Sequence, residues 1–218
     1  SGTGVHISNF AEKNASISFV ASELWEEGRR AISVRSEHIQ NIEKPVGSID
    51  LLAEKSGKTS ADDCGVFDGV FAINVFHIVP TEGMEGFAML CRRVQAWRVV
   101  VYGAWKRNGS FTTQSNADFS AKIASENPGG GLRDVESEFL PAMARHGYEL
   151  EQIIDMPNNN FLMTFRPNFL VLFKLVGSEE RVVQYFDRWR KPAKDGEQTP
   201  DWAGAYFQLN AQHALGTL

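Results

Sequence analysis

Two apolar runs separated by a helical stretch constrain the fold of this 218-residue chain more than any other feature. The first is FDGVFAINVFHIV at 67–79 and the second is WRVVVY at 97–102. Strands buried on both faces have this character, because helices cover both sides of a parallel sheet. The stretch 82–94 between the two runs has a helical pattern, so the chain is predicted to have an α/β fold.

Helical and extended patterns alternate along most of the remaining sequence. We predict strands at 16–22 and 48–52, helices at 7–13, 26–42 and 134–146, and a loop over the polar stretch 106–118. The segments 149–155 and 161–166 predict two strands joined by the residues MPNNN, so a mostly parallel sheet ends in an antiparallel hairpin. Beyond 168 only one helix, at 178–190, and a polar tail are expected. We therefore predict a domain at 1–167 and an extension of unknown role at 168–218.

Composition excludes several classes of function. The formal net charge of −5 argues against broad electrostatic binding to nucleic acid, which requires a basic surface. Two cysteines provide no disulfide framework, so we expect a reducing compartment, the cytoplasm or the nucleus. No apolar run approaches the roughly 20 residues that span a bilayer, so no membrane association is expected. The five histidines lack metal-ligand spacing, so no metal site is predicted, and the oligomeric state stays open.

A glycine turn opens the sequence, as Ser-Gly-Thr-Gly at 1–4 ahead of a predicted helix. Glycines at such a turn let the backbone approach a ligand closely. Glu23 follows the next predicted strand, where a carboxylate accepts hydrogen bonds from ribose hydroxyls in dinucleotide-binding folds. Asp50 follows the third predicted strand in the same manner. We therefore expect Gly4, Glu23 and Asp50 to line one cleft; the alternative is a tight turn with two solvated carboxylates.

The glycine pattern narrows the class of ligand. A dinucleotide site has a third glycine, which does not follow Gly2 and Gly4 in this chain, and the Gly-Lys-Ser/Thr ending of a phosphate-binding loop does not follow Gly4 either. S-adenosyl-L-methionine carries a ribose and an adenine but no phosphate, so a short glycine turn with two acids suits it better. The chain starts at Ser1 without a methionine and enters the glycine turn at once, so we expect the first strand to be truncated.

Five motifs occur in a distinctive order: SGTGVH at 1–6, FDGVFAINVFHIVP at 67–80, NGSFTTQSNADF at 108–119, GLRD at 131–134 and DMPNNN at 155–160. Together they resemble the methyltransferase-like 26 family, an uncharacterised group with a class I methyltransferase fold. The resemblance runs from residue 1 to about 167, with matching order and spacing. It implies a Rossmann-like fold and S-adenosyl-L-methionine-dependent methyl transfer to an acceptor that is not established.

The resemblance also implies a cofactor site at the opening turn and the strand ends. The residues that it assigns to cofactor binding are Gly2, Thr3, Gly4, Glu23, Asp50, Leu51 and Asn74. The glycines would form the turn under the methionine part of the cofactor, and Glu23 would hold the ribose. Asp50 and Leu51 would flank the adenine, and Asn74 would lie beneath the transferable methyl.

Two further residues would stand beside the methyl acceptor. His77 is a candidate general base, because its unperturbed pKa of about 6.5 suits proton transfer near neutrality; the alternative is a histidine packed at a strand end. Tyr102, which with Gly103 would end the fifth strand, would either orient the acceptor or belong to the core wall. The family tends to carry Asp-x-Asp where this chain has Glu-Leu-Trp, so Trp25 would either stack near the adenine or cap the core.

Polar motifs after the fifth strand supply the remaining candidates. Asn116 and Asp118, assigned to catalysis, fall in a predicted loop that would cover the acceptor pocket or close on itself as an Asx-type turn. The substrate-binding candidates are Arg133, Asp155 and Asn159. Arg133 would bind an acidic acceptor or pair with Asp134, which is itself a good helix N-cap. The asparagines of the hairpin turn have a structural alternative, because asparagine tolerates positive φ.

The sequence therefore favours an S-adenosyl-L-methionine-dependent methyltransferase. Where amino methyltransferases of nucleic-acid bases carry Asn/Asp-Pro-Pro-aromatic, this chain has NVFH at 74–77, which with the acidic charge favours a small-molecule or protein acceptor. The alternative is a cofactor-binding or protein-interaction domain without catalytic activity. A nicotinamide oxidoreductase is a third reading, weakened by the missing glycine.

Overall fold

The two apolar runs form the neighbouring strands β1 (Gly69–Ile73) and β2 (Arg98–Ala104), which pair in parallel as predicted. The computed structural model describes residues 1–58, 65–168 and 171–172. The chain divides into two compact units, Ser1–Asn168 and Phe169–Leu218. The helix predicted at 178–190 and the tail that follows it lie outside the described residues.

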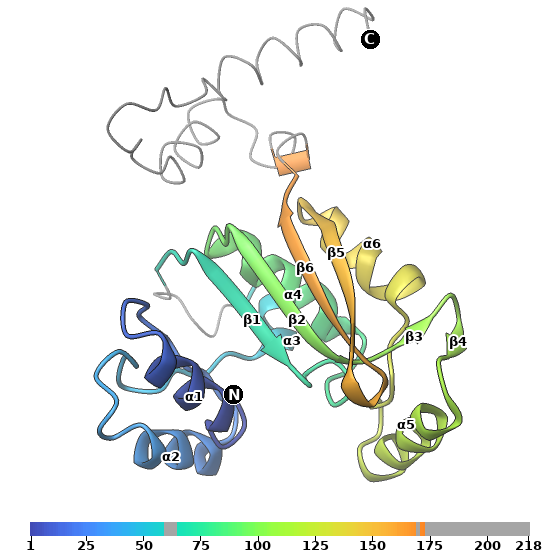
Figure 1. Cartoon of the computed structure of the whole chain (residues 1–218). Coiled ribbons are helices and arrows are strands. Elements are labelled where there is room, and N and C mark those ends of the chain that lie inside the picture. The colour runs from blue at the N-terminus through green and yellow to red at the C-terminus, as the bar shows by residue number, and fades with distance from the viewer. Residues whose placement is uncertain (59–64, 169–170, 173–218) are drawn as a thin grey trace, which may run out of the picture. The chain divides into compact units, whose positions relative to one another are not determined.

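Two antiparallel strands complete a four-stranded sheet in the order β1-β2-β6-β5. β5 (Tyr148–Met156) and β6 (Asn160–Pro167) form the hairpin that the sequence predicts. β6 pairs with β2 from Val99 to Ala104, and Ala104 lies opposite Asn160. The β5–β6 turn and the carboxyl end of β2 therefore share one end of the sheet, the lower end in Figure 1.

Helices α4 (Glu82–Arg93) and α6 (Leu140–Arg145) pack on one face of this sheet and bury the main core, as Figure 1 shows. The helix predicted at 134–146 starts with a turn of π-helix, η1 (Val135–Phe139), before α6. Its end is confirmed, because Gly147 has the left-handed φ of +85° that a helix stop requires.

The main core buries aromatic side chains around Phe76, Trp105 and Phe139. The Phe76 and Phe139 ring centroids are 4.8 Å apart, and those of Trp105 and Phe139 are also 4.8 Å apart. Tyr148 adds a polar contact inside this core, because its hydroxyl donates to the backbone carbonyls of Cys91 at 2.8 Å and Ala96 at 2.9 Å. The hydrogen bonds fix the start of β5 to the segment that precedes β2.

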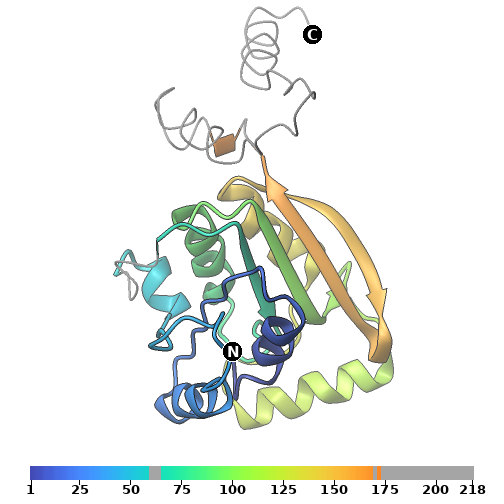
Figure 2. The ribbon, with the colours of Figure 1, turned by 60° about the vertical axis from the view of Figure 1, so that its left-hand side comes forward.

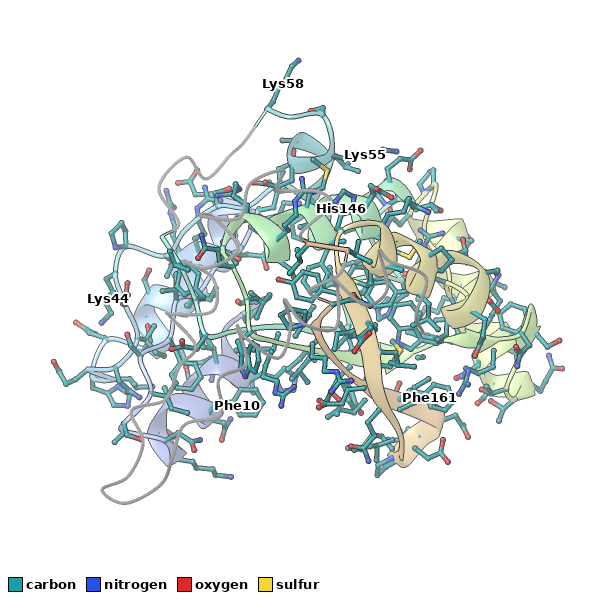
Figure 3. The ribbon with its side chains drawn as sticks, turned by 90° about the horizontal axis from the view of Figure 1, so that it is seen from above. Phe10, Lys44, Lys55, Lys58, His146 and Phe161 are labelled. Atoms are coloured by element: carbon teal, nitrogen blue, oxygen red, sulfur yellow. The ribbon has the colours of Figure 1, made fainter. Side chains whose placement is uncertain are left out.

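A second, smaller core lies between α1 (Val5–Lys13) and α2 (Glu26–Arg35). Its buried side chains are Ile7, Ala11, Ala21, Ile32, Ile39, Ile42 and Val46. Phe10 of α1 also makes an edge-on contact with Phe71 of β1, with ring centroids 5.5 Å apart. Figure 3 shows Phe10 well away from Phe161, which belongs to the main core.

Three predictions for this N-terminal part are wrong in extent or type. The strand predicted at 16–22 forms only two isolated parallel bridges, Phe19 with Ile42 and Ser22 with Gly47, and at its start the Asn41 side chain, not a strand, binds the Ile17 carbonyl at 2.9 Å. The helix predicted at 26–42 ends at Arg35, where the Lys44 ammonium binds carbonyls beyond its end. The strand predicted at 48–52 does not form, because residues 48–50 belong to no regular element and Asp50 caps helix α3 (Leu51–Lys55).

The polar stretch predicted as a loop at 106–118 contains regular structure. A short hairpin of β3 (Lys106–Arg107) and β4 (Ser110–Phe111) turns at Asn108 and Gly109, which both have positive φ. Helix α5 (Gln114–Glu126) follows, and in Figures 1 and 2 it runs below the sheet from the side of the β5–β6 turn. The Thr113 hydroxyl caps α5 by accepting the amide of Asn116 at 3.2 Å, so the loop prediction is wrong.

Candidate functional site

A pocket of about 330 Å³ lies where β1 and β2 end, between α5 and the β5–β6 turn. We call it the asparagine pocket. It is lined by Asn74, His77, Ala104, Ser115, Asn116, Phe119, Asn158 and Asn160. These residues come from four separate parts of the chain and include no side chain with a fixed charge. The pocket is therefore polar but neutral, apart from the titratable imidazole of His77.

The wall that carries His77 is a turn rather than a continuation of the strand. The strand predicted at 67–79 stops at Ile73, because Asn74 takes a positive φ of 56°. The backbone amide of Asn74 still bonds the Tyr102 carbonyl of β2 at 2.9 Å. Phe76 then turns into the main core, while His77 stays half-buried at the pocket. The His77 ring meets Phe119 of α5 edge-on, with ring centroids 5.4 Å apart.

The opposite wall joins α5 to the β5–β6 turn through Asn116. This side chain is buried, and its amide nitrogen donates to the Thr112 hydroxyl at 2.9 Å and to the Asn159 carbonyl at 3.2 Å. Asn160 donates to the Tyr102 hydroxyl at 3.0 Å, which links the same turn to β2. Asn116 therefore contacts the backbone of Asn159, and Tyr102 contacts the pocket residue Asn160 without lining the pocket itself.

His77 and Arg133 are electrostatically coupled. Burial is the main cause that lowers the pKa of His77 below its ordinary value, and the positive charge of Arg133 lowers it further. Burial likewise lowers the pKa of Arg133, against the opposing charges of Glu138 and Glu82. His77 is therefore neutral at pH 7, with a ring nitrogen able to accept a proton.

The glycine turn and Glu23 meet as expected. The Gly2 amide donates to the Glu23 carboxylate at 2.7 Å, and the Trp25 amide donates to it at 3.3 Å. Burial alone would raise the pKa of Glu23, and the hydrogen bonds from the Gly2 and Trp25 amides oppose that effect. The turn is tight because Gly4 begins α1 with a φ of +83°.

Glycine is also required at a third position beside this carboxylate. A β-carbon built on Gly28 would lie 2.5 Å from Cγ of Glu23 and 3.1 Å from the carbonyl oxygen of Gly2. Any larger residue would push Glu23 away from the turn. Gly28 could not be predicted as a site residue, because its position within α2 gives no indication of this contact.

Asp50 has a local partner at the start of α3. Its carboxylate accepts the amides of Leu52 at 2.9 Å and Ala53 at 3.4 Å, which makes Asp50 the N-cap. The Glu23 amide bonds the Gly47 carbonyl at 3.0 Å, so the segment before Asp50 runs beside the one that ends at Glu23. Thr3, the remaining residue of the glycine turn, offers its carbonyl to Arg35 at 3.0 Å.

Asn74, His77 and Asn116 are the predicted site residues that line the asparagine pocket, and Asp118, Asp155 and Arg133 are among those that do not. Asp118 is exposed on α5 and accepts a hydrogen bond from Gln114 of the same helix at 2.9 Å. Asp155 is exposed on β5, opposite Phe161 of β6. Arg133 is buried and donates only to backbone carbonyls among the described residues, whereas its neighbour Asp134 caps η1, as expected for that residue.

Sequence reasoning missed several pocket residues because it treated the 106–118 segment as a loop. Ser115 and Phe119 line the pocket from one face of α5, at positions four apart, which is the helical spacing. Asn158 and Asn160 arrive from the hairpin turn. The predicted hairpin, combined with its pairing to β2, was the one available indication that this turn reaches the site.

A second hollow, an open groove of about 800 Å³ between α1 and α2, contains none of the predicted site residues. Among the described residues, no helix has the length and apolarity needed to cross a membrane. In the same part of the chain, no group of three or more His, Cys, Asp or Glu side chains is arranged to hold a metal ion.

A family model described as "Protein of unknown function (DUF938)" matches residues 1–167. Solved structures with similar folds include PigF with SAH, 14% identical over 77% of this chain and 54% of that chain, with a TM-score of 0.61. An O-methyltransferase family protein from Burkholderia thailandensis is 14% identical over 76% of this chain and 48% of its own, with a TM-score of 0.63. The LepI complex with SAM is 14% identical over 76% and 41%, with a TM-score of 0.58.

These likenesses confirm the predicted Rossmann-like class I methyltransferase fold, with its mixed sheet and terminal hairpin. The chain spans about half the length of the solved proteins that it matches.

Proposed function

The chain belongs to the DUF938 family, and we propose that it is an S-adenosyl-L-methionine-dependent methyltransferase acting on a small-molecule acceptor. The observation that carries the proposal is the asparagine pocket, which presents a neutral histidine at the carboxyl ends of β1 and β2. Ligands of open α/β sheets bind at this edge. The fold is shared with proteins solved with SAH and with SAM. The finer resemblance to the methyltransferase-like 26 family is part of the same proposal.

The N-terminal residues fit the proposed cofactor. Glu23 already stands against the Gly2 amide, and the space that it occupies is kept open by Gly28. We assign the ribose to Glu23 and the methionine part to the turn at 2–4. Trp25 is 70% exposed beside Glu23, so it does not cap the core and is available to stack on the adenine. When bound, the cofactor supplies a methyl group on a positively charged sulfur.

We assign the contacts to the adenine and to the methyl group of the cofactor to residues at the start of α3 and at the end of β1. Asp50 and Leu51 are assigned to the adenine, with Asp50 already oriented as the cap of α3. Asn74 is assigned to the position beneath the methyl, because it lines the asparagine pocket directly after β1.

His77 is proposed to remove the proton of an acceptor hydroxyl. Its lowered pKa keeps the imidazole unprotonated at pH 7, which a general base requires. Asn116 and Asn160 line the same pocket, and because their amide nitrogens already donate within the protein, their amide oxygens are the groups that would orient a neutral polar acceptor. A pocket of about 330 Å³ is of the size that small ligands occupy, which supports a small molecule over a protein side chain.

Calorimetry with S-adenosyl-L-methionine, SAH and NADH tests the cofactor, and a panel of hydroxylated metabolites tests the acceptor. We expect the first two to bind and NADH not to bind. Binding without turnover on any acceptor would favour the alternative, a cofactor-binding or protein-interaction domain. Binding of NADH alone would refute the proposal.

His77→Ala tests the proposed base, with His38→Ala as the matched control. His38 lies in the exposed part of the α1–α2 region and pairs weakly with Glu12 at 3.7 Å. We expect His77→Ala to lower turnover by about 10²–10⁴-fold with little change in cofactor affinity. Equal turnover in the two variants would remove His77 from the reaction.

A further inference from the structure

The turn at 76–79, which carries His77, is held through every one of its backbone carbonyls. Arg133 donates from Nε to the Phe76 carbonyl at 3.1 Å and from Nη2 to the Val79 carbonyl at 2.5 Å. The Gly131 amide donates to the His77 carbonyl at 2.8 Å, and the Asn127 side chain donates to the Ile78 carbonyl. Four consecutive carbonyls are thus bound by one segment, residues 127–133, which we call the clamp loop.

The sequence of the clamp loop, NPGGGLR, fits this role. A β-carbon on Gly130 would lie 2.8 Å from Ile123 and 3.1 Å from the His77 carbonyl oxygen, so a side chain there would separate the loop from the turn. Gly131 has a φ of +130°, a conformation that favours glycine and aims its amide at His77. Arg133 also donates to the Gly129 carbonyl, which closes the loop on itself.

Arg133 has a geometry that suits positioning rather than ligand binding. It is only 9% exposed, and its guanidinium spans three carbonyls in two segments. A planar guanidinium presents its donors in a fixed fork, so it sets the separation of the groups that it binds. A lysine ammonium, with one nitrogen, does not reach all three positions.

We propose that the clamp loop, with Arg133 as its main positioning residue, holds His77 in its orientation toward the asparagine pocket. This inference rests on the proposed function for its catalytic meaning, because it assigns His77 the role of base. The substrate-binding role predicted for Arg133 is replaced by an action through His77. A displacement of about 1 Å in a catalytic group is enough to lower turnover on the order of 10²-fold.

The charge of Arg133 has a second effect on the same histidine. The positive charge of Arg133 acts on His77, and the negative charges of Glu82 in α4 and Glu138 in η1 act on Arg133. Removing the positive charge of Arg133 therefore raises the pKa of His77, whereas moving the guanidinium without removing its charge leaves that pKa low. Charge and geometry are thus separable by substitution.

The test uses nuclear magnetic resonance of the full chain, which needs no acceptor. Two readouts are followed: the titration midpoint of His77 and the ring-proton contact between His77 and Phe119, whose centroids lie 5.4 Å apart. Arg133→Met should raise the midpoint and weaken the contact. Arg133→Lys should keep the midpoint low and weaken the contact. Asn127→Ala removes only the hydrogen bond to the Ile78 carbonyl, so it should weaken the His77–Phe119 contact and leave the titration midpoint unchanged. This variant keeps the test valid if the Arg133 variants do not fold.

Arg98→Met, at an exposed arginine on β2 paired with Glu151, is the control and should change neither readout. An unchanged contact in folded Arg133→Met and Asn127→Ala variants would overturn the clamp. SAH affinity, measured in parallel, should stay at the wild-type value in all variants. If His77→Ala retains turnover while the clamp variants behave as expected, the proposed base is refuted but the clamp stands.

Discussion

Gly86→Ala provides a sharp test of how α3 and α4 position the proposed adenine site. A β-carbon on Gly86 would lie 1.7 Å from the Leu51 carbonyl oxygen and 2.7 Å from its carbonyl carbon. Carbon and oxygen atoms without a normal hydrogen bond stay at least about 3.3 Å apart, so α3 has to move by roughly 1.6 Å. The backbone of α3 is the obstacle, and a change of side-chain rotamer does not relieve it.

The movement of α3 is opposed by an ion pair. Glu54 of α3 is 2% exposed and binds Arg93 of α4 through both carboxylate oxygens, at 2.8 and 3.2 Å. Overpacking of this kind costs typically about 1–3 kcal/mol. Replacing glycine by alanine inside a helix returns about 0.5–1 kcal/mol. We expect a net loss of about 1–2 kcal/mol, which lowers Tm by roughly 2–8 °C for a domain of this size.

Urea and thermal unfolding measure the loss, and SAH calorimetry measures the accompanying displacement of Asp50 and Leu51. Gly83→Ala is the matched control, because it lies in the same helix and gains the same propensity. Its β-carbon would meet a methyl group of Val79 at 2.9 Å and the Val79 β-carbon at 3.2 Å, a milder clash that involves a side chain and not the backbone of α3. If Gly86→Ala is as stable as Gly83→Ala, the close approach of α3 to α4 does not exist in solution.

Three further outcomes are expected. Tyr148→Phe should lower the free energy of unfolding in urea by about 1–3 kcal/mol, because two buried carbonyls lose their donor; no change would mean that water replaces the hydroxyl. Burial raises the pKa of Asp134, but hydrogen bonds from Ser137 and Gly109 lower it overall, so its stabilisation is present above the unfolded pKa of about 3.9 and lost as pH falls through the folded pKa. Asp134→Asn should therefore flatten the acid limb of a stability–pH curve, and an unchanged limb would contradict this. Glu23→Ala should weaken SAH binding by about 1–3 kcal/mol in calorimetry if the carboxylate holds the ribose, and unchanged affinity would remove it from the site.

The main sheet could be predicted because its strands carry long apolar runs and its hairpin alternates around a clear turn. The glycine turn meeting Glu23 was also predictable, since both follow the spacing of a nucleotide-type fold. At the starts of α3 and α5 the secondary-structure prediction is wrong because of local side-chain hydrogen bonds. Asp50 caps a helix where a strand was expected, and Thr113 starts α5 where a loop was expected. Such caps favour helix over extended backbone in short segments, where β-propensity is weak.

The candidate site was harder to predict because its parts are distant in sequence. His77, Asn116 and Asn159 were selected from their motifs, but the motif GLRD suggested ligand binding for Arg133. Only the fold shows that the carbonyls of the turn at 76–79 lie within reach of that side chain. In a sequence, a buried arginine that binds backbone carbonyls cannot be distinguished from an arginine that binds substrate.

The two cores of this domain differ greatly in what holds them together. The smaller one contains seven buried apolar residues and two isolated bridges, whereas the larger one is crossed by a four-stranded sheet. Local unfolding starts where the fewest apolar contacts oppose it, so amide protons of α1 and α2 should exchange with solvent before those of β2 and α4. A ligand that binds Glu23 and Asn74 at the same time would connect the smaller core to the larger one. Its binding energy would then stabilise the smaller core and slow amide exchange in α1 and α2.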